Sequence, residues 1–389
     1  MAASLGQAVR HHWGLRDDIL FLNHGSYGAT PKAVLAEQRR WQALMEENPV
    51  NFMRRVLPPA LAQARADLAR FLRADPADLG FVENATGGVN AVLRSLDFTQ
   101  GDEILVTSHG YNAVKQTVHF IEEKTGAAIK IAEVPFPLDG PDAITAAVTS
   151  SLSDRTRLVI LDHITSPTAT IQPLKELIAA CKSEKRLVLV DGAHAPGMLD
   201  LDVPAIGADF YTGNCHKWLC APKGCAFLWV APGRQTSIHP TTISHPFRTG
   251  FAEEFSWTGT RDASAWLSVG ATIGFFDTIG GLPAVRAYCQ GLVTEAAEML
   301  SSAWETRIGT PASLRGNMAT IRLPERFRDI PAQTILDELW ENHRIEVPVH
   351  HFGGDPWVRI SAAPYNHIQE YEILRDAVLA YSGTASDRN

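Results

Sequence analysis

One lysine of this chain has an unusual setting for a charged side chain. Residues 212–220 read TGNCHKWLC, so that Lys217 lies between His216 and Trp218, soon after the apolar run ADFY. A buried ammonium group loses its hydration unless it is paired or neutralised. Lys217 therefore either bends out to water or is held in the interior as an amine that does chemistry.

An aspartate and a histidine follow another apolar run. Asp191 ends RLVLVD, and His194 follows within the segment DGAH. One interpretation is a turn-forming aspartate with a capping role. The other is a buried carboxylate that meets a protonated ring nitrogen, the arrangement that pyridoxal phosphate needs to act as an electron sink. Since an amine such as Lys217 can form a Schiff base with the aldehyde of that cofactor, the two residues together favour the second interpretation.

A third segment with small residues suits an anion. In ENATGGVNAVLRSL, residues Thr86, Gly87 and Gly88 open an expected helix directly after an expected strand. Backbone N–H groups at a helix N-terminus can approach a phosphate, and the helix dipole favours its negative charge. Taken alone, the segment is also compatible with a plain strand-to-helix turn.

The surrounding pattern explains how these residues meet. Between residues 80 and 230, β-rich runs alternate with segments whose apolar residues recur at three- and four-residue spacings. The runs are LGFVEN, EILVTS, AIKIAEV, RLVILDHI, RLVLVDGA, ADFYTGN and KGCAFLWVA. Such alternation predicts a mostly parallel sheet covered on both faces, with a ligand site at the carboxyl ends of the strands. The flanks at 30–75 and 263–308 are expected to be helical, and the tail is expected to form a small α+β domain.

Composition narrows the class of protein. The chain has 389 residues, 45% of them hydrophobic, and a net charge of −8 without a basic block, which argues against nucleic acid as a partner. No apolar run is long enough to span a membrane, and the first residues lack the apolar stretch of a secretory signal. The five cysteines have no zinc-ligand spacing, so no metal site is predicted. We expect a cytoplasmic protein with reduced thiols.

With these motifs in order, the sequence resembles the fold-type I pyridoxal-phosphate enzymes of the class V aminotransferase superfamily, within the group similar to isopenicillin N epimerase and hercynylcysteine sulfoxide lyase. The matching segments are FLNHGSYGATP, NATGGVNAVLRSL, VDGAHAPG, GNCHKWLCAPKG and EVPVH…WVRISAAPYN. The resemblance implies an α/β fold, with a large domain built on a mostly parallel seven-stranded sheet and a small α+β domain. The implied division is an N-terminal arm with part of the small domain (1–60), a large cofactor-binding domain (61–265) and a C-terminal small domain (266–389).

The resemblance also implies how the cofactor is held. Lys217 would carry the Schiff base and shuttle the α-proton, Asp191 would pair with the pyridine nitrogen, and His194 would lie near the phenolic oxygen. Residues implied to hold the phosphate are Thr86, Gly87, Asn214, His216 and, across the interface of a homodimer, Thr260. Tyr111 falls where relatives stack a ring on the cofactor. The plainer alternatives are a half-buried strand-end tyrosine for Tyr111 and a turn residue for Thr260.

Substrate contacts follow from the same resemblance. Arg359, in WVRIS, falls where the α-carboxylate is bound, and a guanidinium fork suits a carboxylate; the alternative is a surface charge on an edge strand. His24 and Ser26, in NHGSYG, either line the substrate entrance or form a turn. Arg54, in NFMRR, is a further candidate for a substrate contact.

The cofactor leaves the reaction open. Cysteine desulfurases use a mobile cysteine in the C-terminal half, but no cysteine follows Cys289 here, and DGAH replaces their DGAQ. The remaining reactions are β-elimination from a cysteine conjugate, epimerisation, and a decarboxylating or deaminating variant. Tyr111 suits either protonation of a leaving sulfur or proton donation at the second face of the α-carbon. We favour the C–S lyase over the epimerase, and an enzyme over a binding module that has lost catalysis.

Overall fold

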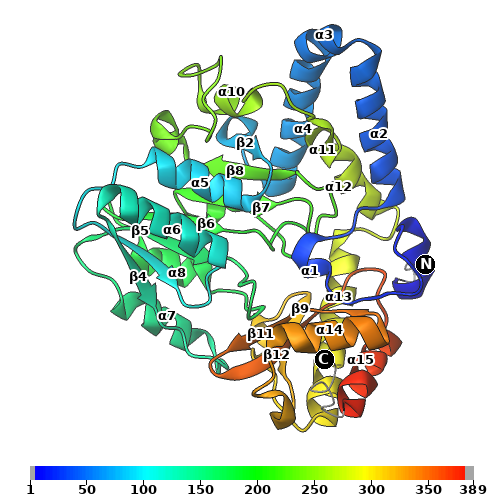
Figure 1. The fold of residues 1–389 in the computed structure, drawn as a ribbon. Coiled ribbons are helices and arrows are strands. Elements are labelled where there is room, and N and C mark those ends of the chain that lie inside the picture. The colour runs from blue at the N-terminus through cyan, green and yellow to red at the C-terminus, as the bar shows by residue number, and fades with distance from the viewer. Residues whose placement is uncertain (1–4, 382–389) are drawn as a thin grey trace, which may run out of the picture.

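The computed structural model of the protein describes residues 5–381. At its centre lies a seven-stranded sheet with the order β2-β8-β7-β6-β5-β3-β4 (Figure 1). The strands are β2 (Leu79–Val82), β3 (Glu103–Thr107), β4 (Ala128–Ala132), β5 (Thr156–Asp162), β6 (Leu187–Asp191), β7 (Phe210–Asn214) and β8 (Ala226–Val230). Strand β8 runs antiparallel to β2 and β7, and the other pairs are parallel. The predicted sheet is therefore confirmed.

Both faces of this sheet are buried. Alternate side chains point to opposite faces of a strand: Ile104 and Ile160 pack in one apolar cluster, whereas Leu105 and Leu161 pack in another. The first cluster includes residues of α5, α6 and α10, and the second includes residues of α4 and α8. The helices around the sheet are α4 (Leu57–Leu72), α5 (Ala85–Ser95), α6 (Asn112–Thr125), α7 (Pro141–Ser150), α8 (Leu174–Cys181), α9 (Val203–Ile206) and α10 (Phe251–Ser256). Burial on two sides explains the near-continuous Val/Ile/Leu runs of the strands.

A smaller unit packs below the large sheet in Figure 1. Its antiparallel sheet has the order β11-β12-β9. Its elements are α13 (Leu282–Ala303), β9 (Met318–Arg322), α14 (Ala332–His343), β11 (Val349–Phe352), β12 (Asp355–Ser361) and α15 (Ile368–Ala380). The N-terminal segment joins this unit, because β1 (Leu20–Phe21) pairs in parallel with β10 (Ile345–Glu346). The domain boundaries at residues 60 and 265 stay a prediction.

The remaining helices connect these units. Helices α2 and α4 rise side by side to the top of the molecule, where α3 joins them (Figure 1). The connecting elements are α1 (His24–Tyr27), α2 (Lys32–Glu47), α3 (Pro49–Asn51), the π-helical segment Phe52–Val56, α11 (Ser264–Leu267) and α12 (Val269–Asp277). Within residues 5–381 no single helix has the length and apolar composition to cross a membrane; only the bent pair Ser264–Asp277 and Leu282–Ala303 meets both measures together.

Candidate active site

Lys217 lies at the carboxyl edge of the large sheet, just after β7 ends. Its side chain lines a cavity of about 460 Å³, which also receives the last residues of β5, β6 and β7. The structure brings together eight of the residues that the sequence singled out: Ser26, Thr86, Tyr111, Asp191, His194, Asn214, His216 and Lys217. The ends of three strands therefore meet at one cavity, while the functional roles of these residues stay a prediction.

The lysine is buried and has little access to water. Its residue exposure is 9%, and its Nζ atom lies 3.1 Å from Nε2 of His194. Burial, and then the positive charge of Arg359, lower the pKa of the Lys217 amine to about 7 from its ordinary 10.5, against the opposite effect of Asp191 and Asp162. A large part of Lys217 is therefore uncharged near neutral pH, which is the nucleophilic form of an amine.

Two carboxyl groups line this cavity side by side. Asp162 ends β5 and Asp191 ends β6, and the two occupy paired positions in the sheet. Burial, and then the negative charge of Asp191, raise the pKa of Asp162 well above the ordinary value. Burial also raises the pKa of Asp191, but Asp191 accepts a 3.0 Å hydrogen bond from the N–H of Ala193 and is attracted by Lys217. The proton of the pair therefore resides on Asp162, and Asp191 is the anion.

The N-terminus of α5 faces the same cavity. Asn84 caps the helix by accepting a 2.9 Å hydrogen bond from the N–H of Gly87, and Asn214 Oδ1 accepts one of 2.8 Å from the N–H of Ala85. Thr86, between them, lines the cavity. Because the N–H groups of Gly87 and Ala85 are already used, Thr86 and the amide nitrogen of Asn214 are the groups left to meet an anion. The predicted phosphate contact through the Gly87 N–H is not supported by this geometry.

His216 and Tyr111 occupy two other walls. Nδ1 of His216 lies 3.2 Å from the Cys225 carbonyl oxygen, to which only an N–H can donate. Burial, and then the charge of Lys217, lower the pKa of His216 to about 4, so the ring is neutral. Its one proton is on Nδ1, and Nε2 carries a lone pair. A phosphate contact at Nε2 then requires the ring to gain a proton. Tyr111 precedes α6 and is 44% exposed, so its phenol lies at the open part of the cavity.

Arg359 approaches from the small unit. It projects from β12, is only 2% exposed, and donates to the carbonyl oxygen and hydroxyl group of Ser166 and to Ser26 Oγ at 3.1 Å. Its second terminal nitrogen lies 3.4 Å from Asn23 Oδ1. No carboxylate in residues 5–381 forms an ion pair with Arg359. A buried guanidinium without an anionic partner, held by hydroxyl and carbonyl groups, is suited to the carboxylate of a ligand.

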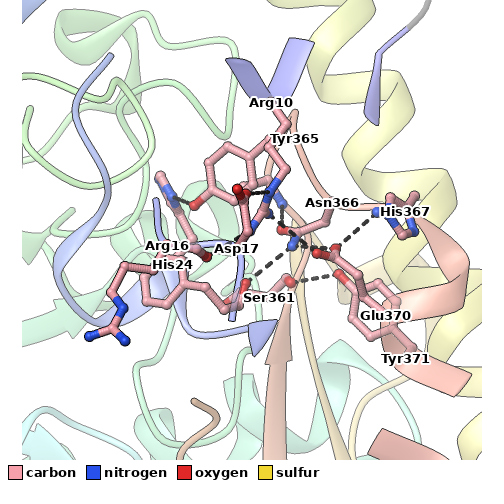
Figure 2. Close-up of polar contacts among 12 residues, drawn as sticks. Arg10, Arg16, Asp17, His24, Ser361, Tyr365, Asn366, His367, Glu370 and Tyr371 are labelled. Atoms are coloured by element: carbon pink, nitrogen blue, oxygen red, sulfur yellow. Dashed lines mark hydrogen bonds and ion pairs between the residues drawn. The ribbon is translucent and has the colours of Figure 1, made fainter. Parts of the chain in front are cut away.

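His24 has a different place from the predicted substrate entrance. It is 1% exposed, its Nε2–H donates to the carbonyl oxygen of Lys217 at 3.0 Å, and its Nδ1 accepts from the Tyr365 hydroxyl group at 2.7 Å. Figure 2 shows His24 joined to Tyr365, beside a polar cluster that includes Asn366 and Glu370. His24 therefore holds the backbone of Lys217 in place. The expected substrate contact of His24 is wrong for this arrangement, because both ring nitrogens are used inside the protein.

Two further predicted residues lie outside the cavity. Thr260 is exposed in the loop after α10, and Arg54 is exposed in the π-helical segment near the tip of α2 and α4. Neither side chain lines the cavity within one chain. Their predicted contacts, with a partner's phosphate and with substrate, remain predictions.

Among the residues of this site that sequence reasoning missed, four bear on its chemistry. Asp162, Ser166 and Lys223 line the cavity, and Trp218 donates its indole N–H to Nδ1 of His194 at 3.3 Å. Asp162 carried a usable signal, since it ends an apolar run in the same way as Asp191. Ser166 and Lys223 lie in loops, where sequence alone does not indicate direction. Trp218 has no sequence signal beyond its position beside Lys217.

The residues present fit pyridoxal phosphate. The cavity holds one uncharged amine for the aldehyde, one anionic carboxylate for a protonated ring nitrogen, and a helix N-terminus with Thr86 for a phosphate. No group of three or more His, Cys, Asp or Glu side chains in the described part of the chain is arranged to hold a metal ion.

Comparisons with known proteins agree with this fit. The aminotransferase class-V family profile matches residues 28–374. The chain is 34% identical to putative L-cysteine desulfhydrase 1 of Oryza sativa subsp. japonica, over 97% of this chain and 85% of that protein. It is 33% identical to the isopenicillin N epimerase of Streptomyces clavuligerus, over 98% and 100%. A solved structure of the cystine C–S lyase C-DES with cysteine persulfide superposes with a TM-score of 0.79 at 23% identity, over 94% and 98%, which shows the same fold.

Proposed function

The chain belongs to the aminotransferase class-V family of pyridoxal-phosphate enzymes, and we propose that it breaks the C–S bond of cysteine or a cysteine conjugate by β-elimination. One observation carries the proposal: the uncharged Lys217 amine and the Tyr111 phenol line one cavity together with Ser26 and Ser166, the two residues that hold the Arg359 guanidinium. Relatives named L-cysteine desulfhydrase from rice and Arabidopsis thaliana, 31–34% identical, support it.

Each residue has a part in the proposed reaction. Arg359 binds the substrate α-carboxylate, and Ser26 and Ser166 hold the guanidinium in place. When bound, pyridoxal phosphate supplies the electron sink for the negative charge that develops at the substrate α-carbon. Asp191 keeps the cofactor's ring nitrogen protonated, and Thr86 with Asn214 holds its phosphate. Lys217 takes the α-proton, since its lowered pKa suits proton transfer near neutral pH.

The leaving sulfur needs a proton from another group. Tyr111 lines the same cavity as Lys217, and its exposed position leaves room for a substituent on sulfur. We assign the phenol O–H as the acid that protonates the departing thiolate. The products are a thiol and an enamine. Water then hydrolyses the enamine to pyruvate and ammonia.

A persulfide route through a protein cysteine has no support. All five cysteines are buried, and none lines the cavity. Burial raises the pKa of the Cys220 thiol, the cysteine nearest in sequence to Lys217 on its C-terminal side, to about 12. A thiol nucleophile needs the opposite environment, exposed and with a lowered pKa.

Epimerisation is the second candidate. The observation that favours it is the isopenicillin N epimerase of Streptomyces clavuligerus, which aligns with this chain over its whole length. In that reaction Tyr111 would return a proton to the second face of the α-carbon. No particular contact favours a decarboxylating or deaminating variant, and a binding module that has lost catalysis would not need an uncharged buried lysine.

A homodimer and a cytoplasmic location belong to the same proposal. Large apolar side chains stand exposed in one chain, among them Val50 at 64% and Ile243 at 54%, and a second copy would cover such side chains. The unpaired cysteines suit a reducing compartment.

The proposal is tested by loading the protein with pyridoxal phosphate and supplying L-cysteine and S-substituted cysteines. A yellow protein whose colour is bleached by borohydride, and which releases pyruvate and ammonia, supports it. A protein that binds the cofactor but releases neither product from any cysteine derivative contradicts the lyase assignment.

A further inference from the structure

Trp218 holds His194 by a single directed hydrogen bond. The indole Nε1–H lies 3.3 Å from Nδ1 of His194, and an indole nitrogen can only donate. Nδ1 of His194 is therefore an acceptor without a proton. Burial, the largest cause, holds the pKa of His194 well below its ordinary range, so the ring is neutral. A neutral imidazole with a bare Nδ1 carries its proton on Nε2.

That Nε2–H faces the lysine. Nε2 of His194 lies 3.1 Å from Nζ of Lys217. An uncharged amine can accept this hydrogen bond through its lone pair, whereas an ammonium group has only donors and meets the N–H with no acceptor. The tautomer of His194 thus favours the uncharged form of Lys217 by geometry, in addition to burial.

The indole is held tightly enough to fix this direction. Trp218 is 4% exposed and packs in a small apolar cluster with Met198 and Met318. The indole ring centroid lies 4.9 Å from that of the His24 ring, and a Cβ on Gly25 would meet the indole ring at 3.3 Å. These close approaches leave the ring little freedom to turn away from His194.

We propose that Trp218 is a positioning residue that locks His194 in the Nε2–H tautomer. In this tautomer His194 keeps the Lys217 amine uncharged and directs an N–H donor, not a lone pair, toward the cavity. Only the catalytic role of this arrangement rests on the proposed function, because an uncharged Lys217 serves any reaction of the bound cofactor. The lock itself is a property of the cofactor-free chain.

Replacing Trp218 by phenylalanine removes the donor and keeps an aromatic ring. Nδ1 of His194 then has no fixed partner, the ring can exchange tautomers, and its Nε2 lone pair can accept from a Lys217 ammonium group. Other charged and titratable groups around the lysine are unchanged in this variant: Asp162, Asp191, His216 and Arg359. The pKa of Lys217 should therefore rise by about one unit, the value of one hydrogen bond.

Nuclear magnetic resonance of the full, cofactor-free chain measures both properties. Nitrogen shifts of labelled histidine give the His194 tautomer, and the Cε shift of labelled Lys217 against pH gives its pKa, with His194→Gln and Lys217→Arg used to assign the signals. A matched control is Trp304→Phe, since Trp304 also donates one 3.3 Å indole hydrogen bond but lies against α15. The expected result is an Nε2–H tautomer in the unmodified chain and a raised Lys217 pKa in Trp218→Phe alone.

Two outcomes overturn the proposal. A proton on Nδ1 of His194 in the unmodified chain excludes the lock without any variant, so misfolding of Trp218→Phe cannot hide it. An unchanged Lys217 pKa in a folded Trp218→Phe chain shows that burial alone sets the pKa of the amine. The His194 tautomer and the Lys217 pKa are measured without substrate, so failure of the lyase assay does not affect them. The C–S lyase hypothesis and the Trp218 hypothesis are therefore tested separately.

Discussion

Asp162 and Asp191 are paired across neighbouring parallel strands, and both carboxyl groups line the cavity that contains Lys217. Two adjacent buried carboxyl groups cannot both be ionised cheaply, so one keeps its proton. The N–H of Ala193 favours the anion at Asp191, and burial beside that anion raises the pKa of Asp162 well above its ordinary value, which leaves the proton on Asp162.

Asp162→Asn should therefore be well tolerated. The amide keeps a neutral donor in nearly the same shape, and we expect cofactor binding and kcat close to those of the unmodified enzyme. Asp191→Ala should lose roughly two orders of magnitude or more in kcat while retaining much of the cofactor, because an electrostatic partner of the ring is removed. Steady-state kinetics with cofactor absorbance compares the two; equal losses in both variants would show that Asp162 acts as an anion.

Arg359→Lys should weaken substrate binding more than turnover. The guanidinium fork holds a carboxylate through two parallel hydrogen bonds, which a single ammonium group cannot reproduce. We expect KM to rise roughly tenfold to a hundredfold with a smaller change in kcat. Lys223→Arg serves as a control for the exchange of one cation for another, because Lys223 lines the cavity. An unaltered KM in Arg359→Lys would remove Arg359 from carboxylate binding.

Tyr111→Phe separates the two proposed reactions. The ring stays but the proton donor is lost, so kcat for thiol release should fall by roughly 10²–10⁴ with little change in KM. Exchange of the substrate α-proton with deuterated solvent should continue, because that step belongs to Lys217. If exchange and thiol release fall together, Tyr111 serves the α-carbon, and the epimerase becomes the better account.

Mixed dimers test the shared site. If Thr260 of one subunit completes the partner's phosphate site, Thr260→Ala should bind the cofactor more weakly, and mixing it with Lys217→Ala should restore activity in the hybrid. Light scattering at the assay concentration gives the oligomeric state. A fully active monomer would contradict the shared site.

The sequence allowed much of this site to be predicted because its parts follow strands. Lys217, Asp191 and Thr86 each come just after an apolar run, and parallel strands bring such positions to one edge. Strand order and register were needed for Asp162, since its protonation depends on the residue paired with it. The motif NHGSYG indicated a site, but only the fold shows that Ser26 faces Arg359 while His24 faces the backbone of Lys217.

Trp218 shows a second limit of sequence reasoning. Its type and position suit an ordinary core residue, and its burial in an apolar cluster is consistent with that. The contribution proposed for it depends on the direction of one hydrogen bond, from the indole N–H to the His194 ring. Such a relation is specified by side-chain direction, which neither spacing nor composition records.

Product analysis with an S-substituted L-cysteine tests the central claim most directly. The enzyme loaded with pyridoxal phosphate is incubated with the substrate in deuterated water, and pyruvate, ammonia, free thiol and the optical purity of remaining substrate are measured together, with Lys217→Ala as the control. We predict equal amounts of pyruvate, ammonia and thiol, and none from Lys217→Ala. Racemised, deuterated substrate with no pyruvate and no thiol would contradict the C–S lyase and establish an epimerase in its place.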